Sequence, residues 1–140
     1  MNKRTGVFVC HCGINIAGTV DVKSVAKELS KHEGVVLSED YVYMCSDPGQ
    51  KLIEKSIKEH KLDSFVVACC SPSLHESTFR NVAKTSGLNP YQCEIANIRE
   101  QCSWIHKDKA KATEKAKKIV KSLVKMTLKV ENVEPIRTHV

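Results

Sequence analysis

Short apolar runs alternate along this chain with longer stretches in which apolar residues recur at helical spacing. The apolar runs are rich in valine and predict four β-strands, at 6–10, 34–45, 62–70 and 91–97. The second run contains polar residues at 38–40, where the strand is expected to break. The periodic stretches predict four helices, at 20–32, 47–61, 71–87 and about 104–129.

This fourfold repeat of strand and helix predicts an α/β fold. We expect an open, mostly parallel four-stranded sheet flanked by helices on both faces, in Rossmann- or flavodoxin-like layering, with a long C-terminal helix. Right-handed crossovers bring every strand-to-helix turn to the same carboxyl edge of such a sheet. Residues that are distant in sequence but follow a strand should therefore meet at this edge.

Residues at the predicted helix ends support these assignments. Thr19 or Asp21 can cap the first helix, and Asp47 is expected to cap the second, with Pro48 at its first helical position. Gly87 suits the position just beyond the end of the third helix. The region 131–140 contains proline and shows no periodicity, so we interpret it as a linker after a single domain that spans 1–130.

The chain contains seven cysteines, and most of them follow predicted strands. Those expected at the carboxyl edge are Cys10, Cys12, Cys45, Cys69, Cys70 and Cys102. The remaining one, Cys93, lies inside the fourth strand and is interpreted as a packing residue. Several thiols at one edge are what a zinc ion or an iron-sulfur cluster requires, since each is held by about four thiolates.

The cysteine spacing leaves three interpretations open. No Cys-x-x-Cys pair occurs, which argues against a zinc ribbon and against a ferredoxin-type run. The thiols can instead form a redox pair, since Cys10 with Cys12 and Cys69 with Cys70 would form strained, easily reduced disulfides. Free cysteines also serve as small core residues. Nucleotide binding is disfavoured because the chain has no GxGxxG or Walker sequence.

Composition and charge limit the possible partners and the possible cellular location of the protein. The net charge is +6, but much of the excess lies in lysines between 107 and 129, on one predicted helix and without interleaved aromatic residues. A nucleic-acid partner is therefore not expected. The N-terminus lacks the apolar segment of a signal peptide, and no apolar run has the length of a membrane span. We therefore expect a cytoplasmic protein with reduced thiols and no membrane association.

Other side chains near the predicted edge are candidates for secondary roles. His11, His75 and His106 can act as ligands or orient ligands, although a packing or surface role is the commoner one for each. A group of larger side chains can offset the charge of a cluster or form a docking face; it comprises Arg80, Arg99 and Trp104.

Four segments together resemble the N-terminal domain of the A subunit of heterodisulfide reductase. They are VFVCHCGINIAGTVDV, YMCSDPGQ, VVACCSPSLHESTFR and NIREQCSWIHKDKAKATEKA, in this order between about 6 and 120. The resemblance implies one [4Fe–4S] cluster in this domain. It further implies a longer subunit, with a downstream FAD domain and ferredoxin-type modules, in a flavin-based electron-bifurcating complex that reduces a disulfide.

The resemblance also implies partners and ligands. The partners would be other subunits of such a complex, with a hydrogenase- or dehydrogenase-linked electron donor, and a homodimer is compatible with this setting. The family has cysteine at the positions of Cys10, Cys12, Cys45, Cys70 and Cys102, of which four would bind the cluster. Because alternating positions of a strand face opposite ways, we favour the last four, with Cys10 as the substitute. The family more often has alanine at position 69.

The interpretation that follows is an electron-transfer domain without turnover of its own. The alternatives are a thiol/disulfide redox module and a docking domain that binds partner subunits without a cluster.

Overall fold

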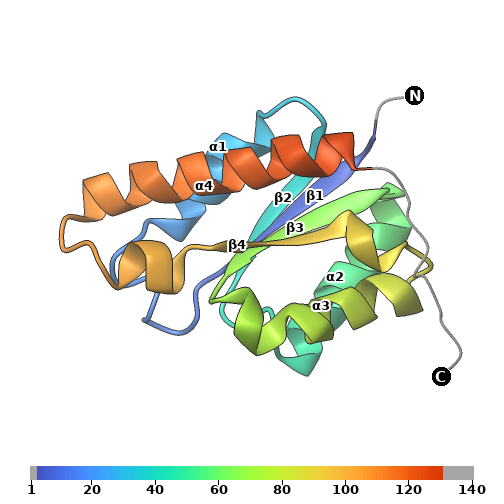
Figure 1. The fold of residues 1–140 in the computed structure, drawn as a ribbon, viewed down its shortest axis with the longest axis horizontal. Helices are drawn as coiled ribbons and strands as arrows, with labels where there is room; N and C mark the ends of the chain where they lie inside the picture. Colours follow the sequence, from blue (N-terminus) through green and yellow to red (C-terminus); the bar gives the residue numbers. More distant parts are fainter. Residues whose placement is uncertain (1–2, 131–140) are drawn as a thin grey trace, which may run out of the picture.

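The computed structural model describes residues 3–130, which form one four-stranded parallel sheet with helices on both faces (Figure 1). The strands lie in the order β2-β1-β3-β4. Their bounds are Thr5–Cys10 for β1, Val35–Tyr41 for β2, Ser64–Cys69 for β3 and Cys93–Asn97 for β4. The α/β fold expected from the sequence is thereby confirmed. The second strand runs unbroken through 38–40, where the sequence had suggested a break, and it ends at Tyr41, earlier than the apolar run suggested.

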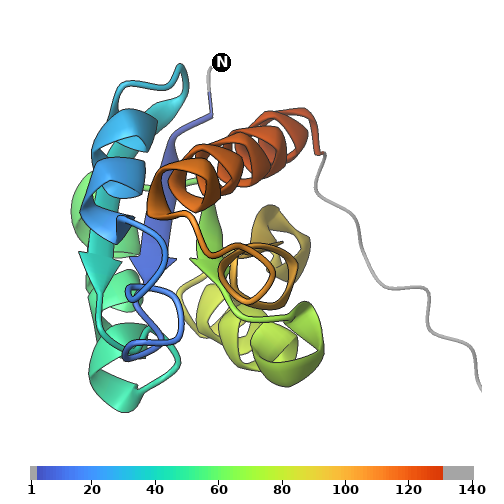
Figure 2. The same ribbon diagram turned by 90° about the vertical axis from the view of Figure 1, so that its left-hand side faces the viewer.

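Two helices cover each face of the sheet (Figures 1 and 2). Helices α1 and α4 span Val22–Ser30 and Lys109–Lys129 and lie on one face. Helices α2 and α3 span Asp47–His60 and Pro72–Thr85 and lie on the other. The structure adds a short 3₁₀ helix, η1 (Pro90–Gln92), and a π-helix, η2 (Arg99–Ser103), that the sequence did not predict. Because η2 and a turn precede it, α4 starts at Lys109 rather than near 104.

Strand alternation divides the core into two halves. On β1, Val7 and Val9 face α1 and α4, whereas Phe8 and Cys10 face α2 and α3. Cys69 of β3 lies on the same side as Cys10. In the register of the two strands Val9 pairs with Ala68. Cys10 and Cys69 each come directly after a residue of this pair. They therefore lie side by side at the ends of neighbouring strands, and both face α2 and α3.

The residues at the helix ends match those expected from the sequence for α1 and α3 but not for α2. Asp21 caps α1 by accepting a hydrogen bond from Ser24 N at 3.1 Å, and Gly87 follows the end of α3 with φ of +86°. The cap of α2 is Ser46, not Asp47: its hydroxyl accepts from Gly49 N at 3.3 Å. Asp47 is the first helical residue, where its negative carboxylate still interacts favourably with the positive end of the helix dipole.

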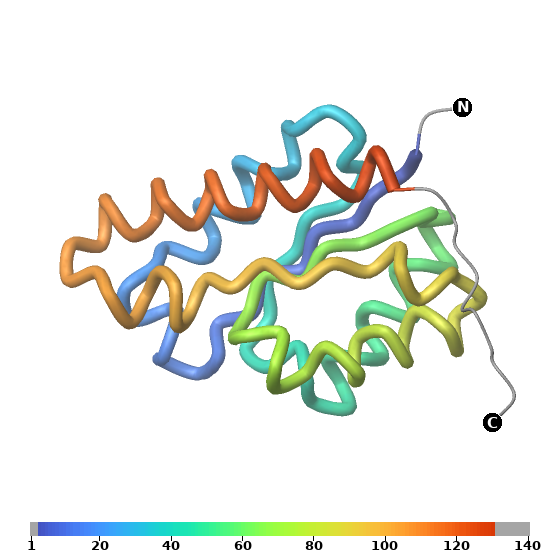
Figure 3. The backbone as a smooth tube through the Cα atoms, viewed as in Figure 1, coloured from blue at the N-terminus to red at the C-terminus, as the bar shows by residue number. Residues whose placement is uncertain are grey.

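The topology places one crevice at the carboxyl edge. The chain passes from β1 outward to β2 and returns to β3 on the other side of β1 (Figure 3). The connection after β1 leads to α1 on one face of the sheet, and the connection after β3 leads to α3 on the other face. Open α/β sheets commonly bind ligands between two neighbouring strands of this kind. Within the described residues no helix is both long and apolar enough to span a membrane. The linker predicted at 131–140 lies outside the described residues, so it and the domain boundary stay predictions.

Candidate functional site

Five cysteine side chains surround one cavity at the carboxyl edge of the sheet. They are Cys10, Cys12, Cys45, Cys69 and Cys70. The other residues around it are Tyr43, His75, Phe79 and Arg99. The cavity measures about 40 Å³, which exceeds the roughly 10–15 Å³ needed by a single water molecule. Thiols from the ends of β1, β2 and β3 thus converge, as the topology predicted.

Cys10 and Cys12 both reach the cavity, although alternation along a strand had suggested that only one of them would. Strand β1 ends at Cys10, and Cys12 has a φ of +50°, in the left-handed region. The chain turns at this point, so the rule for extended strands no longer applies. Gly13 follows with φ of +60°, and a Cβ placed there would lie 2.6 Å from the Tyr43 hydroxyl. The turn therefore favours glycine at position 13.

The Cys10 sulfur is surrounded by backbone groups. It accepts hydrogen bonds from Cys12 N at 3.3 Å and Met44 N at 3.4 Å, and its thiol can donate to Val42 O at 3.7 Å. Burial raises the pKa of Cys10 to about 11, while the two N–H donors act in the opposite direction. N–H groups aimed at a sulfur stabilise a thiolate, and such contacts surround cluster-binding cysteines.

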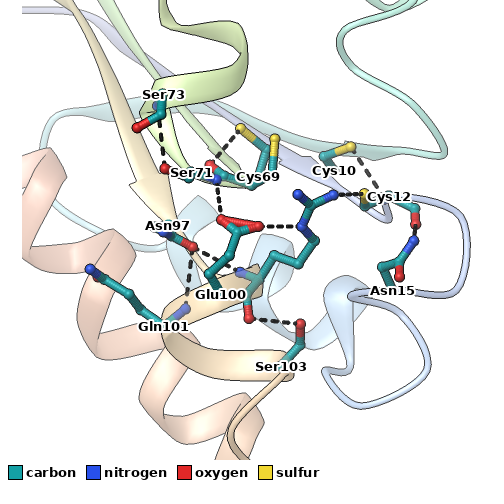
Figure 4. A network of polar contacts seen from close by, with 12 residues as sticks. Cys10, Cys12, Asn15, Cys69, Ser71, Ser73, Asn97, Glu100, Gln101 and Ser103 are labelled. Atoms are coloured by element: carbon teal, nitrogen blue, oxygen red, sulfur yellow. Dashed lines mark hydrogen bonds and ion pairs between the residues drawn. The ribbon is translucent and has the colours of Figure 1, made fainter.

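Cys45 and Cys70 occupy equivalent places at two helices. Each directly precedes a serine that caps a helix: Ser46 at α2 and Ser71 at α3. The Ser71 hydroxyl accepts from Ser73 N at 3.3 Å, as Figure 4 shows. The N-terminal ends of both helices therefore lie beside a thiol. Their partial positive charge favours a thiolate or another bound anion.

The pKa values of the two adjacent cysteines Cys69 and Cys70 are shifted in opposite directions. The Cys69 thiol donates to Cys70 O at 3.6 Å, and both side chains are buried. Hydrogen bonding between the two side chains lowers the pKa of Cys70 and, together with burial, raises that of Cys69. Cys69 therefore holds its proton and acts as the donor. Of the two, Cys70 is the better thiolate ligand.

Cys102 does not line the cavity. It belongs to η2, is fully buried among residues that face α1 and α4, and its thiol donates to Ala112 O at 3.1 Å. Burial raises its pKa. Cys93, the first residue of β4, is fully buried in the α2 and α3 half of the core. This position agrees with the packing role expected from the sequence.

The histidines take different positions. His75 lines the cavity from the first turn of α3. His11 lies within hydrogen-bonding distance of Asp40, with 2.6 Å between Nε2 and Oδ2. His106 Nδ1 lies 2.9 Å from Cys102 O. Of these three, His75 alone borders the space between the thiols.

Arg99, the unlabelled side chain between Cys12 and Glu100 in Figure 4, connects several parts of the site. Its guanidinium donates to the Cys12 sulfur at 3.2 Å and forms an ion pair with Glu100, whose other oxygen accepts from Ser71 N at 2.5 Å. The guanidinium also lies 4.7 Å from the ring centre of Trp104, a side chain that is 57% exposed. Burial alone would lower the pKa of Arg99, but its hydrogen bonds to Glu100 and Cys12 raise it, so it stays charged.

Arg80 lies elsewhere, contrary to its expected position at the same edge. It pairs with Glu76 at 2.8 Å and donates to Pro90 O and to Cys93 O, at the beginning of β4. Its guanidinium is 5.7 Å from the ring centre of Tyr91. Like Arg99, Arg80 has an ion pair and a ring contact, but its other partners are backbone carbonyls at the opposite end of β4.

The donor set suits a cluster better than a single metal ion. Within residues 3–130, no three side chains from His, Cys, Asp and Glu are close enough together to share one ion. The thiols instead surround a space. A cluster of several iron atoms binds one thiolate per iron, so its ligands stand farther apart than those of a zinc ion. Sulfur donors with N–H and cationic neighbours therefore fit an iron-sulfur cluster.

Curated proteins similar to this chain cover nearly all of it. One is the second iron-sulfur A subunit of the CoB–CoM heterodisulfide reductase of Methanopyrus kandleri, 53% identical over 98% of this chain and 21% of the relative. Another is the iron-sulfur A subunit of the CoB–CoM heterodisulfide reductase of Methanocaldococcus jannaschii, 50% identical over 95% of this chain and 20% of the relative. A third is the A subunit of the H(2):CoB-CoM heterodisulfide,ferredoxin reductase of Methanothermobacter thermautotrophicus, 50% identical over 98% and 21%.

No protein-family model matches the chain. The chain spans about a fifth of the length of the relatives just described. The match nevertheless extends over 134 to 138 residues and includes the loops that carry the thiols. Over nearly its whole length, the chain is homologous to one domain-sized part of the iron-sulfur A subunits of CoB–CoM heterodisulfide reductase.

Proposed function

We propose that this chain is an electron-transfer domain that holds one [4Fe–4S] cluster in the cysteine cavity. The observation that carries the proposal is the convergence of thiols from three separate strand ends on one space. The names of the relatives, which describe iron-sulfur subunits, support it independently. An electron-transfer role in an oxidoreductase follows from the same relationship.

The ligand set that fits best is Cys10, Cys12, Cys45 and Cys70. All four reach the cavity, and two of them lie at helix N-termini. This set replaces Cys102, which was favoured from the sequence, with Cys10. For Cys102 to bind the same cluster, its thiol would have to leave Ala112 O and move out of the opposite half of the core.

The bound cluster would supply storage and transfer of one electron. The protein contributes the surroundings. The N–H groups of Cys12 and Met44 donate to the Cys10 sulfur, and the first turns of α2 and α3 present their positive ends. Phe79, which is buried beside the thiols, limits access of water. Burial and hydrogen bonds to sulfur are the protein's main means of tuning the potential of such a site.

The setting that we infer is a heterodisulfide reductase-type complex. One relative is named as the A subunit of a ferredoxin/F(420)H(2)-dependent CoB-CoM heterodisulfide reductase. We infer that this chain passes electrons between an FAD domain, carried by the longer subunit, and a further redox module of a bifurcating complex. The electrons would come from a hydrogenase- or dehydrogenase-linked donor. The oxidoreductase function would then belong to the assembly.

A thiol/disulfide module is the second candidate, because Cys69 and Cys70 are adjacent and hydrogen-bonded. A disulfide between adjacent cysteines is strained and therefore easily reduced. The two candidates differ in their requirement for Cys69. A thiol couple of this kind loses its two-electron chemistry in Cys69→Ala, whereas the proposed cluster is retained.

The test is anaerobic reconstitution followed by the visible spectrum. Cys45→Ala should lose most of the charge-transfer absorption of the wild-type protein, because one of the four proposed ligands is removed. Cys93→Ala is the matched control, since it removes a buried thiol away from the cavity. An undiminished spectrum in Cys45→Ala, or equal losses in both variants, would contradict the proposal.

A further inference from the structure

We propose that Arg99 is a positioning residue whose positive charge, held against the Cys12 sulfur, raises the reduction potential of the cluster. This inference rests on the proposed function. It assigns the control of the potential to one side chain that does not bind iron.

The position of Arg99 is fixed from several sides. One terminal nitrogen of the guanidinium donates to the Cys12 sulfur at 3.2 Å, while Nε pairs with Glu100. Glu100 is itself held by Ser71 N at 2.5 Å. Trp104 packs over the guanidinium at 4.7 Å. Because three partners restrain it, the charge stays at one distance from the sulfur and needs little rearrangement when the charge of the site changes.

The surroundings make this charge effective. The side chain of Arg99 is only 15% exposed, and it lies among the residues that line the cavity. Water screens such a charge far less than it screens a charge on the surface. When a reductant such as dithionite gives one electron to the cluster, the site gains one negative charge. A nearby positive charge stabilises that reduced form more than the oxidised form and therefore raises the potential.

Glu100 should act in the opposite direction. Its carboxylate pairs with Arg99 and carries a negative charge close to the same thiols. Removal of this charge while the shape is kept, as in Glu100→Gln, should raise the potential. Loss of Arg99 and loss of Glu100 thus have opposite expected signs. General disturbance of the site would instead move both variants in the same direction.

The experiment compares midpoint potentials of the reconstituted protein by EPR-monitored redox titration. Arg99→Gln should shift the potential to more negative values, whereas Arg99→Lys should keep most of the wild-type potential because the charge is kept. The matched control is Arg80→Gln, which removes the same charge from an arginine with an ion pair and a ring contact at the beginning of β4. It should leave the potential close to that of the wild type.

Iron and sulfide are measured first, so that the proposal and the inference fail separately. A wild-type chain without iron after reconstitution overturns the proposed function. If the wild type carries a cluster but Arg99→Gln has the same midpoint potential, only the role of Arg99 is overturned. Shifts of the same sign in Arg99→Gln and Glu100→Gln would also overturn that role. If Arg99→Gln takes up no cluster, uptake by Arg99→Lys supports the requirement for charge, and failure of both overturns it.

Discussion

The backbone N–H of Cys12 donates a hydrogen bond to the Cys10 sulfur over 3.3 Å, so the two thiols at the end of β1 belong to one local structure. Met44, from the loop after β2, donates to the same sulfur at 3.4 Å. The position of Cys10 at the cavity is thus built into the backbone of two loops. It follows that disturbance of the turn at 12–13 should affect the site as a whole.

Gly13→Ala should destabilise the protein more than Gly87→Ala does. Both glycines have positive φ, which costs a residue with a Cβ about 1 kcal/mol. Only at position 13 would the new Cβ also meet a neighbour, the Tyr43 hydroxyl at 2.6 Å, whereas nothing lies within 4 Å at position 87. The Tyr43 side chain is half-exposed and can move aside, so we expect a total loss of about 1–2 kcal/mol for Gly13→Ala.

Anaerobic urea unfolding of the cluster-free protein measures this difference. Gly87→Ala serves as the control for backbone strain alone. Equal losses for the two variants would mean that the contact with Tyr43 does not shape the turn.

Cys10→Ser and Cys102→Ser should separate the two candidate ligand sets. Loss of the Cys10 thiolate should abolish or strongly reduce iron uptake, since Cys10 lies at the cavity. A serine at position 102 can still donate to Ala112 O, so the fold and the iron content should persist. Iron per chain after anaerobic reconstitution decides between them. The reverse pattern would restore Cys102 as a ligand and remove Cys10.

The cluster-free protein should lose stability at alkaline pH in part through Cys10. Its folded-state pKa is raised from 9.0 to about 11 by burial. Above pH 9 the thiol ionises in the unfolded chain but not in the folded protein, so stability falls as the pH rises from about 9 to 11. The two-unit shift corresponds to about 2–3 kcal/mol.

Urea unfolding at pH 8 and pH 10.5 tests this pH dependence. The wild-type protein should lose more stability between these values than Cys10→Ala does. Parallel losses would show that the ionisation of Cys10 is not coupled to folding.

Ser46→Ala should cost about 1 kcal/mol of stability, because the α2 cap is lost. Asp47→Ala should cost less, since Asp47 contributes only through the helix dipole and does not cap. Thermal unfolding of both variants ranks the two residues. A larger effect from Asp47→Ala would restore the capping role that the sequence had suggested.

The arrangement of the sheet was predictable because it depends on periodicity and on the handedness of crossovers, both of which follow from the order of residues along the chain. The same reasoning correctly predicted that Cys12, Cys45 and Cys70 lie at one edge of the sheet. The four strands and the main helices were found in this way. Their boundaries were less accurate, as the early end of β2 and the late start of α4 show.

The positions of Cys10 and Cys102 differ from those expected because of local backbone geometry. The left-handed Cys12 ends the alternation that had separated Cys10 from Cys12. The π-helix at Arg99–Ser103 turns Cys102 toward Ala112 instead of the cavity. Neither feature has a periodic signal in the sequence. For the turn, the adjacent Gly13 was an available hint, since glycine commonly marks positive φ. For Cys102 we see no comparable hint.

The most direct test is the iron and acid-labile sulfide content of the anaerobically reconstituted protein, together with the EPR spectrum after reduction by dithionite. We expect about four irons and four sulfides per chain, with the signal of a reduced [4Fe–4S] cluster. A protein that binds no iron and sulfide under these conditions, while its thiols remain titratable, would overturn the assignment as a cluster-binding domain.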